Sequence, residues 1–415
     1  MTKKTDTPAI RFKGFSDTWE QRKLFEITDK VTEKNAGLQY VETFTNSAEF
    51  GIISQRDFFD HDIAKLGSLD AYYIVKNEDF VYNPRISTSA PVGPINRNKL
   101  GRTGVMSPLY TVFRPHDIDT TYLEYFFKCG YWHSFMNFNG DSGARSDRFS
   151  IRDNVFFQMP IPIPDIDEQR KIGELLTCLD NLITLHQRKY EKLHNIKKSM
   201  LEKMFPKNGS NVPEIRFKGF TEAWEQRKFG EVGETYTGLS GKSKDDFGHG
   251  SGKFITYMNI FSNPVASPNM TESIEIDDSQ NKVRFGDVLF TTSSETPDEV
   301  GMSSVWLENA ENTYLNSFCF GYRPTAEFNP YYLAYMLRSS SMRKKITFLA
   351  QGISRYNISK NKMMDIEMPI PSIDEQKQIG EYFANLDRLI TLHQRKCKIR
   401  ILRCPKSTVY YLGTA

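Results

Sequence analysis

The 415-residue sequence lacks several features that would place it in particular protein classes. No apolar run approaches the roughly 18–20 residues that a membrane-spanning helix needs, so no membrane span is expected. The polar N-terminus, residues 1–6 (MTKKTD), leads into no apolar segment, which argues against a secretory signal. The 5 cysteines are odd in number and never spaced as CxxC. That pattern favours a reducing cytoplasm and argues against structural zinc or a disulfide framework.

The sequence also lacks a strong net charge. Its 54 Lys and Arg residues stand against 51 Asp and Glu residues, which leaves only +3 at pH 7. A protein-wide basic signature for nucleic-acid binding is therefore absent, and any such function has to rest on local patches.

A complete catalytic or cofactor-binding motif is missing as well. Residues 237–243 (TGLSGKS) resemble the end of a phosphate-binding loop, but Tyr236 stands where that motif needs glycine. Glu375 and Lys377 form half of a nuclease motif without the preceding Pro-Asp, and Glu168 occupies the matching place in an earlier segment. We interpret both carboxylates as the solvated first turn of a helix. The sequence predicts no active site, bound metal or bound cofactor in this chain.

What the sequence does contain is an internal duplication. Residues 10–15 (IRFKGF) return as residues 215–220, and residues 182–189 (LITLHQRK) return whole as residues 389–396. Matches of this length in the same order show that one module is present twice. The segments between the matching motifs share little sequence. The two copies therefore have the same flanking motifs but different intervening segments.

Each copy ends in a long predicted helix. The first starts with a capping box formed by Asp165 and Glu168, and the second starts with Ser372 and Glu375. In the first helix, apolar residues then recur at steps of four and three over about four heptads, which is typical of a coiled coil, and the second helix starts alike. We expect an antiparallel pair of helices between two modules related by a pseudo-twofold axis. The alternative is two independent domains with unpaired helices.

His186 and His393 occupy equivalent positions in the two helices. One interpretation is a metal-binding or pH-sensing pair. The interpretation we favour is a polar residue at the helix contact that sets the register of the pair.

The repeated motifs carry a family resemblance. The leader at residues 10–23, the PIPxIxEQ segments at 162–169 and 369–376 and the repeated LITLHQRK resemble the specificity subunit of type I restriction–modification systems. The resemblance covers residues 10 to about 397. It implies an α+β fold, with two target-recognition domains of mixed sheet and helices separated by the two long helices.

The resemblance also implies a function and partners. Each target-recognition domain would read one half of a bipartite, asymmetric site in double-stranded DNA. The helices would set the spacing of the half-sites and dock two methyltransferase subunits, and motor–nuclease subunits would join the full complex. S-adenosylmethionine, ATP and Mg²⁺ would then belong to those partner subunits in the cytoplasm, and this chain would be non-catalytic.

These considerations divide the chain into consecutive parts. They are target-recognition domain 1 at residues 1–164, the first spacer helix at 165–205, the linker and target-recognition domain 2 at 206–371, the second spacer helix at 372–404, and an atypical tail at 405–415. The tail departs from its twin after Lys396, because Arg400 and Arg403 replace apolar residues and Pro405 ends the predicted helix early. This difference puts in question whether the second helix pairs with the first along its whole length, near the first module.

Candidate DNA-binding residues are polar or basic side chains on loops beside predicted strands. Arg148 and Arg355 stand out because both modules keep an arginine before an aromatic residue. Three roles are open for these two arginines: contacts to bases, contacts to phosphates, or structural anchors. The full set comprises Arg85, Ser87, Thr88, Arg97, Lys99, Arg102, Arg145 and Arg148 in the first module, and Thr291, Thr292, Ser293, Ser294, Gln351, Ser354 and Arg355 in the second.

An alternative function is a two-headed protein–protein adaptor with a coiled-coil spacer, which the near-neutral charge leaves open. A steep loss of affinity with salt distinguishes DNA binding from adaptor binding. The sequence does not reveal which bases are recognised or how long the spacer between the two half-sites is.

Overall fold

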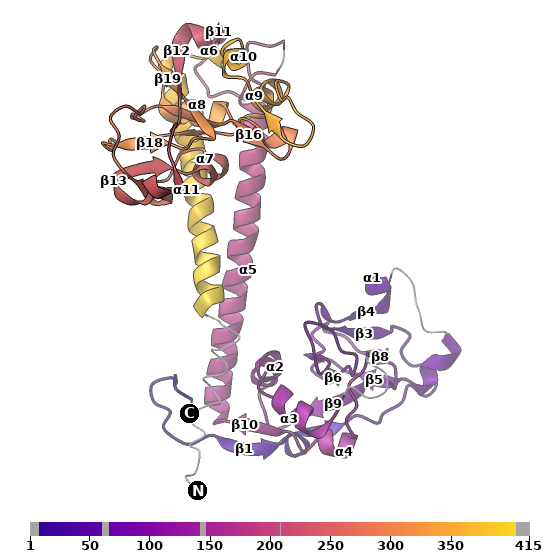
Figure 1. The fold of residues 1–415 in the computed structure, drawn as a ribbon. Helices are drawn as coiled ribbons and strands as arrows, with labels where there is room; N and C mark the ends of the chain where they lie inside the picture. Colours follow the sequence, from indigo (N-terminus) through magenta and orange to yellow (C-terminus); the bar gives the residue numbers. More distant parts are fainter. Residues whose placement is uncertain (1–7, 60–65, 142–146, 208, 404–415) are drawn as a thin grey trace. The chain divides into compact units, whose positions relative to one another are not determined.

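The computed structural model describes residues 8–59, 66–141, 147–207 and 209–403 (Figure 1). The described residues form two compact units. Unit 1 runs to Leu185 and includes the end of the last helix from Cys397, and unit 2 runs from His186 to Lys396. No helix in these residue ranges is long and apolar enough to cross a membrane.

Unit 1 is built around a four-stranded antiparallel sheet with the strand order β2-β9-β6-β7. Strands β3 and β4, β5 and β8, and β1 and β10 form separate antiparallel pairs. The strands are β1 (Glu20–Lys23), β2 (Thr28–Lys30), β3 (Phe44–Ser47), β4 (Gly51–Ser54), β5 (Tyr73–Val75), β6 (Phe80–Tyr82), β7 (Ile95–Arg97), β8 (Gly104–Met106), β9 (Thr111–Pro115) and β10 (Pro160–Ile163). The helices are η1 (Leu24–Glu26), α1 (Gln55–Phe59), η2 (Leu66–Ala71), α2 (Thr120–Lys128), α3 (His133–Asn139) and α4 (Asp153–Phe156).

The central strands of unit 1 are apolar on both faces, which explains why the sheet is buried on both sides. Phe80 and Phe113 stack with their ring centroids 5.6 Å apart in a cluster that includes residues of α2 and α4. Val81 and Val112 belong to a second cluster with Phe44. Because successive side chains of a strand point to opposite faces, two layers of core enclose the sheet.

Unit 2 repeats this plan with the strand order β12-β19-β15-β17. Its strands are β11 (Glu225–Lys228), β12 (Gly233–Thr237), β13 (Phe247–Ile255), β14 (Thr271–Ile274), β15 (Val288–Thr291), β16 (Ser293–Ser294), β17 (Ser303–Val305), β18 (Thr313–Leu315), β19 (Cys319–Pro324), β20 (Tyr356–Asn357) and β21 (Glu367–Ile370). Its short helices are α6 (Phe229–Val232), η3 (Lys244–Asp246), α7 (Tyr257–Ser262), η4 (Pro268–Met270), η5 (Pro297–Glu299), α8 (Pro330–Met336), α9 (Ser340–Thr347) and α10 (Lys360–Met364). Phe290 and Phe320 stack with centroids 5.2 Å apart, as Phe80 and Phe113 do in unit 1.

The two long helices are α5 (Ile166–Lys203) and α11 (Ile373–Arg403). Within unit 2, the end of α5 packs antiparallel to α11. Phe205, just beyond α5, stacks on Phe383 with centroids 5.9 Å apart. Lys197 forms an ion pair with Asp387 further along. The prediction that the tail alters helix closure depends on residues 404–415, which lie outside the described residues.

His186 and His393 meet where α5 and α11 approach each other in unit 2. Their Nδ1 atoms lie 2.9 Å apart, so one ring donates to the other. Within the described ranges, no cluster of three or more His, Cys, Asp or Glu side chains is placed to hold a metal ion. The geometry agrees with a role in setting helix register.

Candidate nucleic-acid interface

A buried ion pair fixes the repeated leader to the start of the long helix in each unit. Arg11 donates from Nε and Nη2 to the Glu168 carboxylate at 2.7 Å and 2.7 Å, and Arg216 donates to Glu375 at 2.7 Å and 2.8 Å. These hydrogen bonds raise the pKa of both arginines above the usual value. Glu168 and Glu375 are only 0% and 1% exposed. The interpretation of these two carboxylates as solvated was therefore wrong, because each has a guanidinium partner distant in the sequence.

The capping boxes form only in part. Ser372 Oγ accepts from the backbone N–H of Glu375 at 3.4 Å, and Asp165 Oδ1 accepts from the backbone N–H of Asp167 at 2.8 Å. In a complete capping box each glutamate carboxylate would accept from the backbone N–H of the capping residue, but here it accepts from an arginine instead. A bidentate guanidinium binds a carboxylate more strongly than one backbone amide does, which explains the difference.

A glutamine beside each buried glutamate joins the long helix to another segment of its unit. Gln169 Oε1 accepts from the backbone N–H of Asp119 at 2.9 Å, and Gln376 Oε1 accepts from that of Asn329 at 3.0 Å. Strands β1 and β10 pair in the same register as β11 and β21, with Glu20 opposite Ile163 and Glu225 opposite Ile370. The repeated motifs therefore form the same internal scaffold in both units.

A second ion pair supports the central sheet. Arg114 on β9 donates to both oxygens of Asp79 at 2.8 Å, and Arg323 on β19 donates to Asp287 at 2.9 Å and 2.7 Å. Both aspartates lie directly before the central strand of their sheet and are buried. The hydrogen bonds raise the pKa of both arginines above the usual value. These pairs anchor the strand that leads into each candidate loop.

In unit 1, the loop after β6 lies against a hairpin that ends at Ser150. Phe149 N donates to Pro84 O at 2.7 Å, and an isolated β-bridge joins Arg85 to Arg148. Asp141 and Ser150 pair through backbone hydrogen bonds of 3.1 Å and 2.7 Å, and the segment between them is called the hairpin of unit 1 below, although its residues 142–146 lie outside the described residues. The predicted residues Arg85, Ser87, Thr88 and Arg148 are thus brought together, and the first three are exposed.

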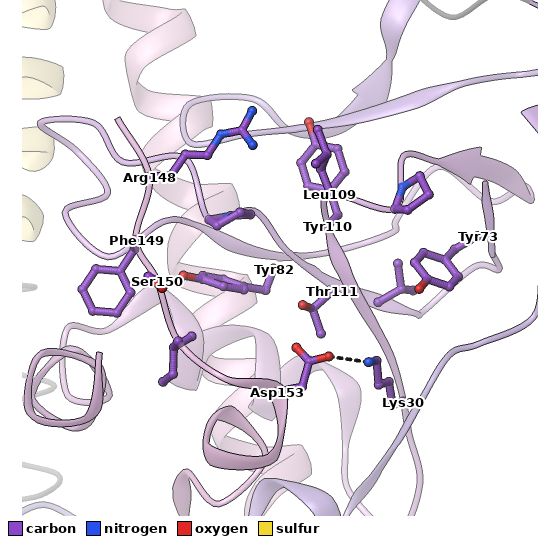
Figure 2. Close-up of a pocket in the computed structure, with 14 residues that line it drawn as sticks. Lys30, Tyr73, Tyr82, Leu109, Tyr110, Thr111, Arg148, Phe149, Ser150 and Asp153 are labelled. Carbon is purple, nitrogen blue, oxygen red and sulfur yellow. Dashed lines mark hydrogen bonds and ion pairs between the residues drawn. The ribbon is translucent and has the colours of Figure 1, made fainter. Parts of the chain in front are cut away.

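Arg148 lies at the edge of a pocket in unit 1. Its guanidinium extends toward Tyr110 and Leu109 (Figure 2). An ion pair between Lys30 and Asp153 lies in another part of the same lining. Arg148 therefore presents its charge on a surface that also offers an aromatic ring.

Unit 2 forms the same arrangement with different residues. Gln351 and Asn357 close a shorter hairpin through hydrogen bonds of 3.0 Å and 2.8 Å. Strand β20 of this hairpin pairs with β16, and Ile358 N donates to Thr292 O at 3.0 Å. The Arg355 guanidinium lies 6.0 Å from the ring centroid of Phe318. Gln351, Ser354 and Arg355 are exposed.

The basic residues predicted on the other loop of unit 1 have acidic partners. The Arg97 side chain is only 10% exposed and forms ion pairs with Glu78 at 2.9 Å and Glu124 at 2.5 Å. Lys99 also contacts Glu124, at 2.8 Å. Arg102 binds both oxygens of Glu42 at 2.8 Å, which holds the pKa of that carboxyl below its usual value. Arg97 is therefore held within the internal scaffold, whereas the Lys99 and Arg102 side chains are 56% and 48% exposed and stay predicted DNA contacts although carboxylates hold them.

Most of the predicted threonine and serine cluster in unit 2 is buried. Thr291 Oγ1 accepts from Met302 N at 3.0 Å, and Ser294 Oγ donates to Glu299 at 3.3 Å. Thr291, Ser293 and Ser294 are all buried, and Thr292 is half-buried. These residues support the hairpin. Arg145, also predicted as a DNA contact, lies outside the described residues.

Comparison with known proteins gives the family of these units. The family model described as "Type I restriction modification DNA specificity domain" matches residues 16–195 and 221–403. The type I restriction enzyme MjaVIII specificity subunit of Methanocaldococcus jannaschii is 25% identical over 287 residues, which are 63% of this chain and 62% of that protein. The putative type I restriction enzyme MjaX specificity subunit of the same organism is 25% identical over 284 residues, 64% of this chain and 61% of that protein.

The matches span less than two thirds of the length of these two relatives. Among solved structures, the S subunit of a type I restriction–modification system from M. genitalium aligns over 99% of both chains. The alignment has a TM-score of 0.51 and a sequence identity of 11%, so it shows a similar fold and nothing further.

Proposed function

Because the chain belongs to the type I restriction modification DNA specificity family, with one family domain in each half, we propose that it is the sequence-reading subunit of a type I restriction–modification complex. Each unit reads one half of a bipartite, asymmetric site in double-stranded DNA. The chain is non-catalytic and acts in the cytoplasm. Methylation and ATP-dependent cleavage reside in partner subunits, which bind S-adenosylmethionine, ATP and Mg²⁺.

One observation carries this proposal. Each unit presents an arginine-bearing hairpin beside the loop after its central strand, on a scaffold held by the same buried ion pairs. The exposed side chains around the hairpins differ, with Arg85 and Thr88 in unit 1 and Gln351 and Ser354 in unit 2. Arginine and short polar side chains are the groups that read base edges and bind phosphates. A constant scaffold with different exposed donors suits two different half-sites.

The long helices support the partner assignment. Leu185 on α5 and Leu392 on α11 are 46% and 44% exposed, and they occupy the same position of the repeated LITLHQRK motif. Exposed leucines at equivalent positions suit two copies of one partner. We propose that these faces dock two methyltransferase subunits and that motor–nuclease subunits join them. In this proposal α5 and α11 form an antiparallel spacer with pseudo-twofold symmetry, which sets the distance between the half-sites.

Co-expression with the methyltransferase partner in a host without adenine methylation tests the proposed function. We expect N6-methyladenine at a single split, non-palindromic motif, because two different modules define the site. The purified complex should also lose DNA affinity steeply as salt rises, since phosphate contacts release counterions. A complex that assembles but methylates no motif and binds DNA without salt dependence would favour the adaptor function.

Replacing Arg148 with alanine is expected to weaken DNA binding and to relax base preference in one half-site only. A bidentate arginine–base contact contributes about 1–3 kcal/mol of discrimination. Arg355→Ala should have the same effect on the other half-site. Binding to a library of half-site variants measures both effects. Arg227→Ala, which removes an arginine on β11 that pairs with Glu231, is the control and should leave the base preference unchanged. Unchanged affinity and preference in Arg148→Ala would remove this residue from the interface.

A further inference from the structure

Two phenylalanines at matching positions of the two units are almost fully exposed. Phe138 is 89% exposed and Phe348 is 88% exposed, more than any other phenylalanine of the described residues. Phe138 lies in the last turn of α3, and Phe348 directly follows α9. Met136 and Ile346, two residues earlier in each case, are fully buried. Each helix thus packs one face into its unit and points a phenylalanine away from it.

Both phenylalanines lie at the base of the arginine-bearing hairpin. Phe138 precedes Asp141 by three residues, and Phe348 precedes Gln351 by three. Asp141 and Gln351 are the residues whose backbone hydrogen bonds close the two hairpins. Single exposed apolar residues are common on protein surfaces. Here two largely divergent modules place the same exposed ring at the same point of the candidate interface, which chance does not explain well.

The surroundings of the rings favour nucleic acid over an apolar protein partner. Lys344 is exposed one helical turn before Phe348, whose backbone N–H donates to Lys344 O at 3.1 Å. Ser134 is exposed at the matching place before Phe138. The Lys344 ammonium group is suited to a phosphate, whereas Ser134 Oγ donates its hydrogen to Tyr131 O at 2.9 Å. The hairpin of unit 2 adds Ile353, which is 95% exposed next to Ser354 and Arg355.

We propose that Phe138 and Phe348 are apolar wedges that insert between base pairs of bound DNA, one in each half-site. This inference rests on the proposed function and extends it. Proteins that insert phenylalanine or isoleucine between base steps partly unstack them and bend the duplex. The cost of unstacking depends on the step and is lowest at pyrimidine–purine steps. The wedges therefore add a preference for a deformable step to the base contacts of each hairpin.

Alanine variants in the complex with the methyltransferase partner test the wedges. Phe138→Ala, Phe348→Ala and the double variant are titrated with a duplex that holds the methylated motif, with 2-aminopurine at each candidate step. We expect roughly tenfold weaker binding per ring, within the range that base–aromatic stacking supplies. The fluorescence rise caused by unstacking should be lost at one half-site in each single variant. The slope of log affinity against log salt should stay unchanged, because phenylalanine neutralises no phosphate.

Two control variants separate the wedge from a general surface effect. Phe285→Ala removes a 53% exposed ring near the start of β15, at the opposite end of the strand from the candidate loop, and should leave affinity and fluorescence unchanged. Phe348→Trp keeps an aromatic ring and should retain most of the affinity.

The outcomes distinguish this inference from the proposed function. If the wild-type complex binds its motif and the alanine variants match it in affinity and fluorescence, the wedges are refuted and the proposed function stands. If the variants lose the methyltransferase subunit while assembled complexes bind DNA normally, the rings contact the partner and the wedges are likewise refuted. If the wild-type complex does not bind DNA, both proposals fail.

Discussion

Replacing Glu375 with alanine is expected to destabilise unit 2 by about 3–5 kcal/mol, the cost typical of breaking a buried ion pair. The variant leaves the Arg216 guanidinium, 12% exposed, without its counter-charge. The lost contact joins the repeated leader to α11, so β11 and β21 should also lose protection. Urea unfolding gives the change in stability, and hydrogen exchange of the amides in these strands locates it.

Glu381→Ala is the matched control for this prediction. Glu381 is an exposed glutamate on the same helix, and its replacement should change stability by no more than about 0.5 kcal/mol. The combined Arg216→Met and Glu375→Leu variant should recover much of the loss, because paired apolar side chains leave no buried charge behind. A Glu375→Ala protein as stable as the Glu381→Ala protein would show that the ion pair does not hold the scaffold together.

Replacing Phe383 with alanine is expected to cost about 3–5 kcal/mol, as is usual for a fully buried phenylalanine. The ring is 0% exposed and stacks between Phe205 and Tyr335, at centroid distances of 5.9 Å and 5.2 Å. Its removal opens a cavity where α11, α8 and the end of α5 meet within unit 2. The midpoint of urea unfolding measures the loss.

Leu176 provides a comparison within the same chain. It occupies the position in the first copy that Phe383 occupies in the second, but it is only half-buried. We expect Leu176→Ala to cost clearly less than the roughly 2–5 kcal/mol typical of a buried leucine. In unit 2, Phe205 at the end of the first copy stacks on Phe383. The second copy departs from the first after Lys396, so its sequence holds no counterpart of Phe205 for Leu176. Equal losses in the two variants would contradict this account.

The duplication and the helix starts are features that sequence reasoning predicts well. Both depend on residues close together in the chain, such as the PIPxIxEQ segments and the heptad spacing that follows them. The observed helices begin at Ile166 and Ile373, directly after the predicted caps Asp165 and Ser372. Arg148 and Arg355 were also singled out from local similarity between the copies, whereas the hairpins that carry them were not predicted.

The polar residues of the candidate site show where local reasoning ends. Arg97 and Thr291 have the side chains expected of DNA contacts, but the first is held by carboxylates and the second is buried. Loop position and residue type do not reveal which internal partner a side chain will meet. The exposure of Phe138 and Phe348 was not predicted for the same reason, since their common position three residues before Asp141 and Gln351 is apparent only once the structure shows where the hairpins close.

The sequence by itself determined that one module occurs twice, that each copy ends in a long helix, and to which family the chain is similar. Tertiary structure alone decided which charges are buried and which loops meet. Glu168 and Glu375 find their arginines 157 and 159 residues away in the chain. Contacts at that separation depend on how strands and helices pack. The spacing of neighbouring residues therefore encodes the scaffold, whereas packing selects the side chains that remain available to bind DNA.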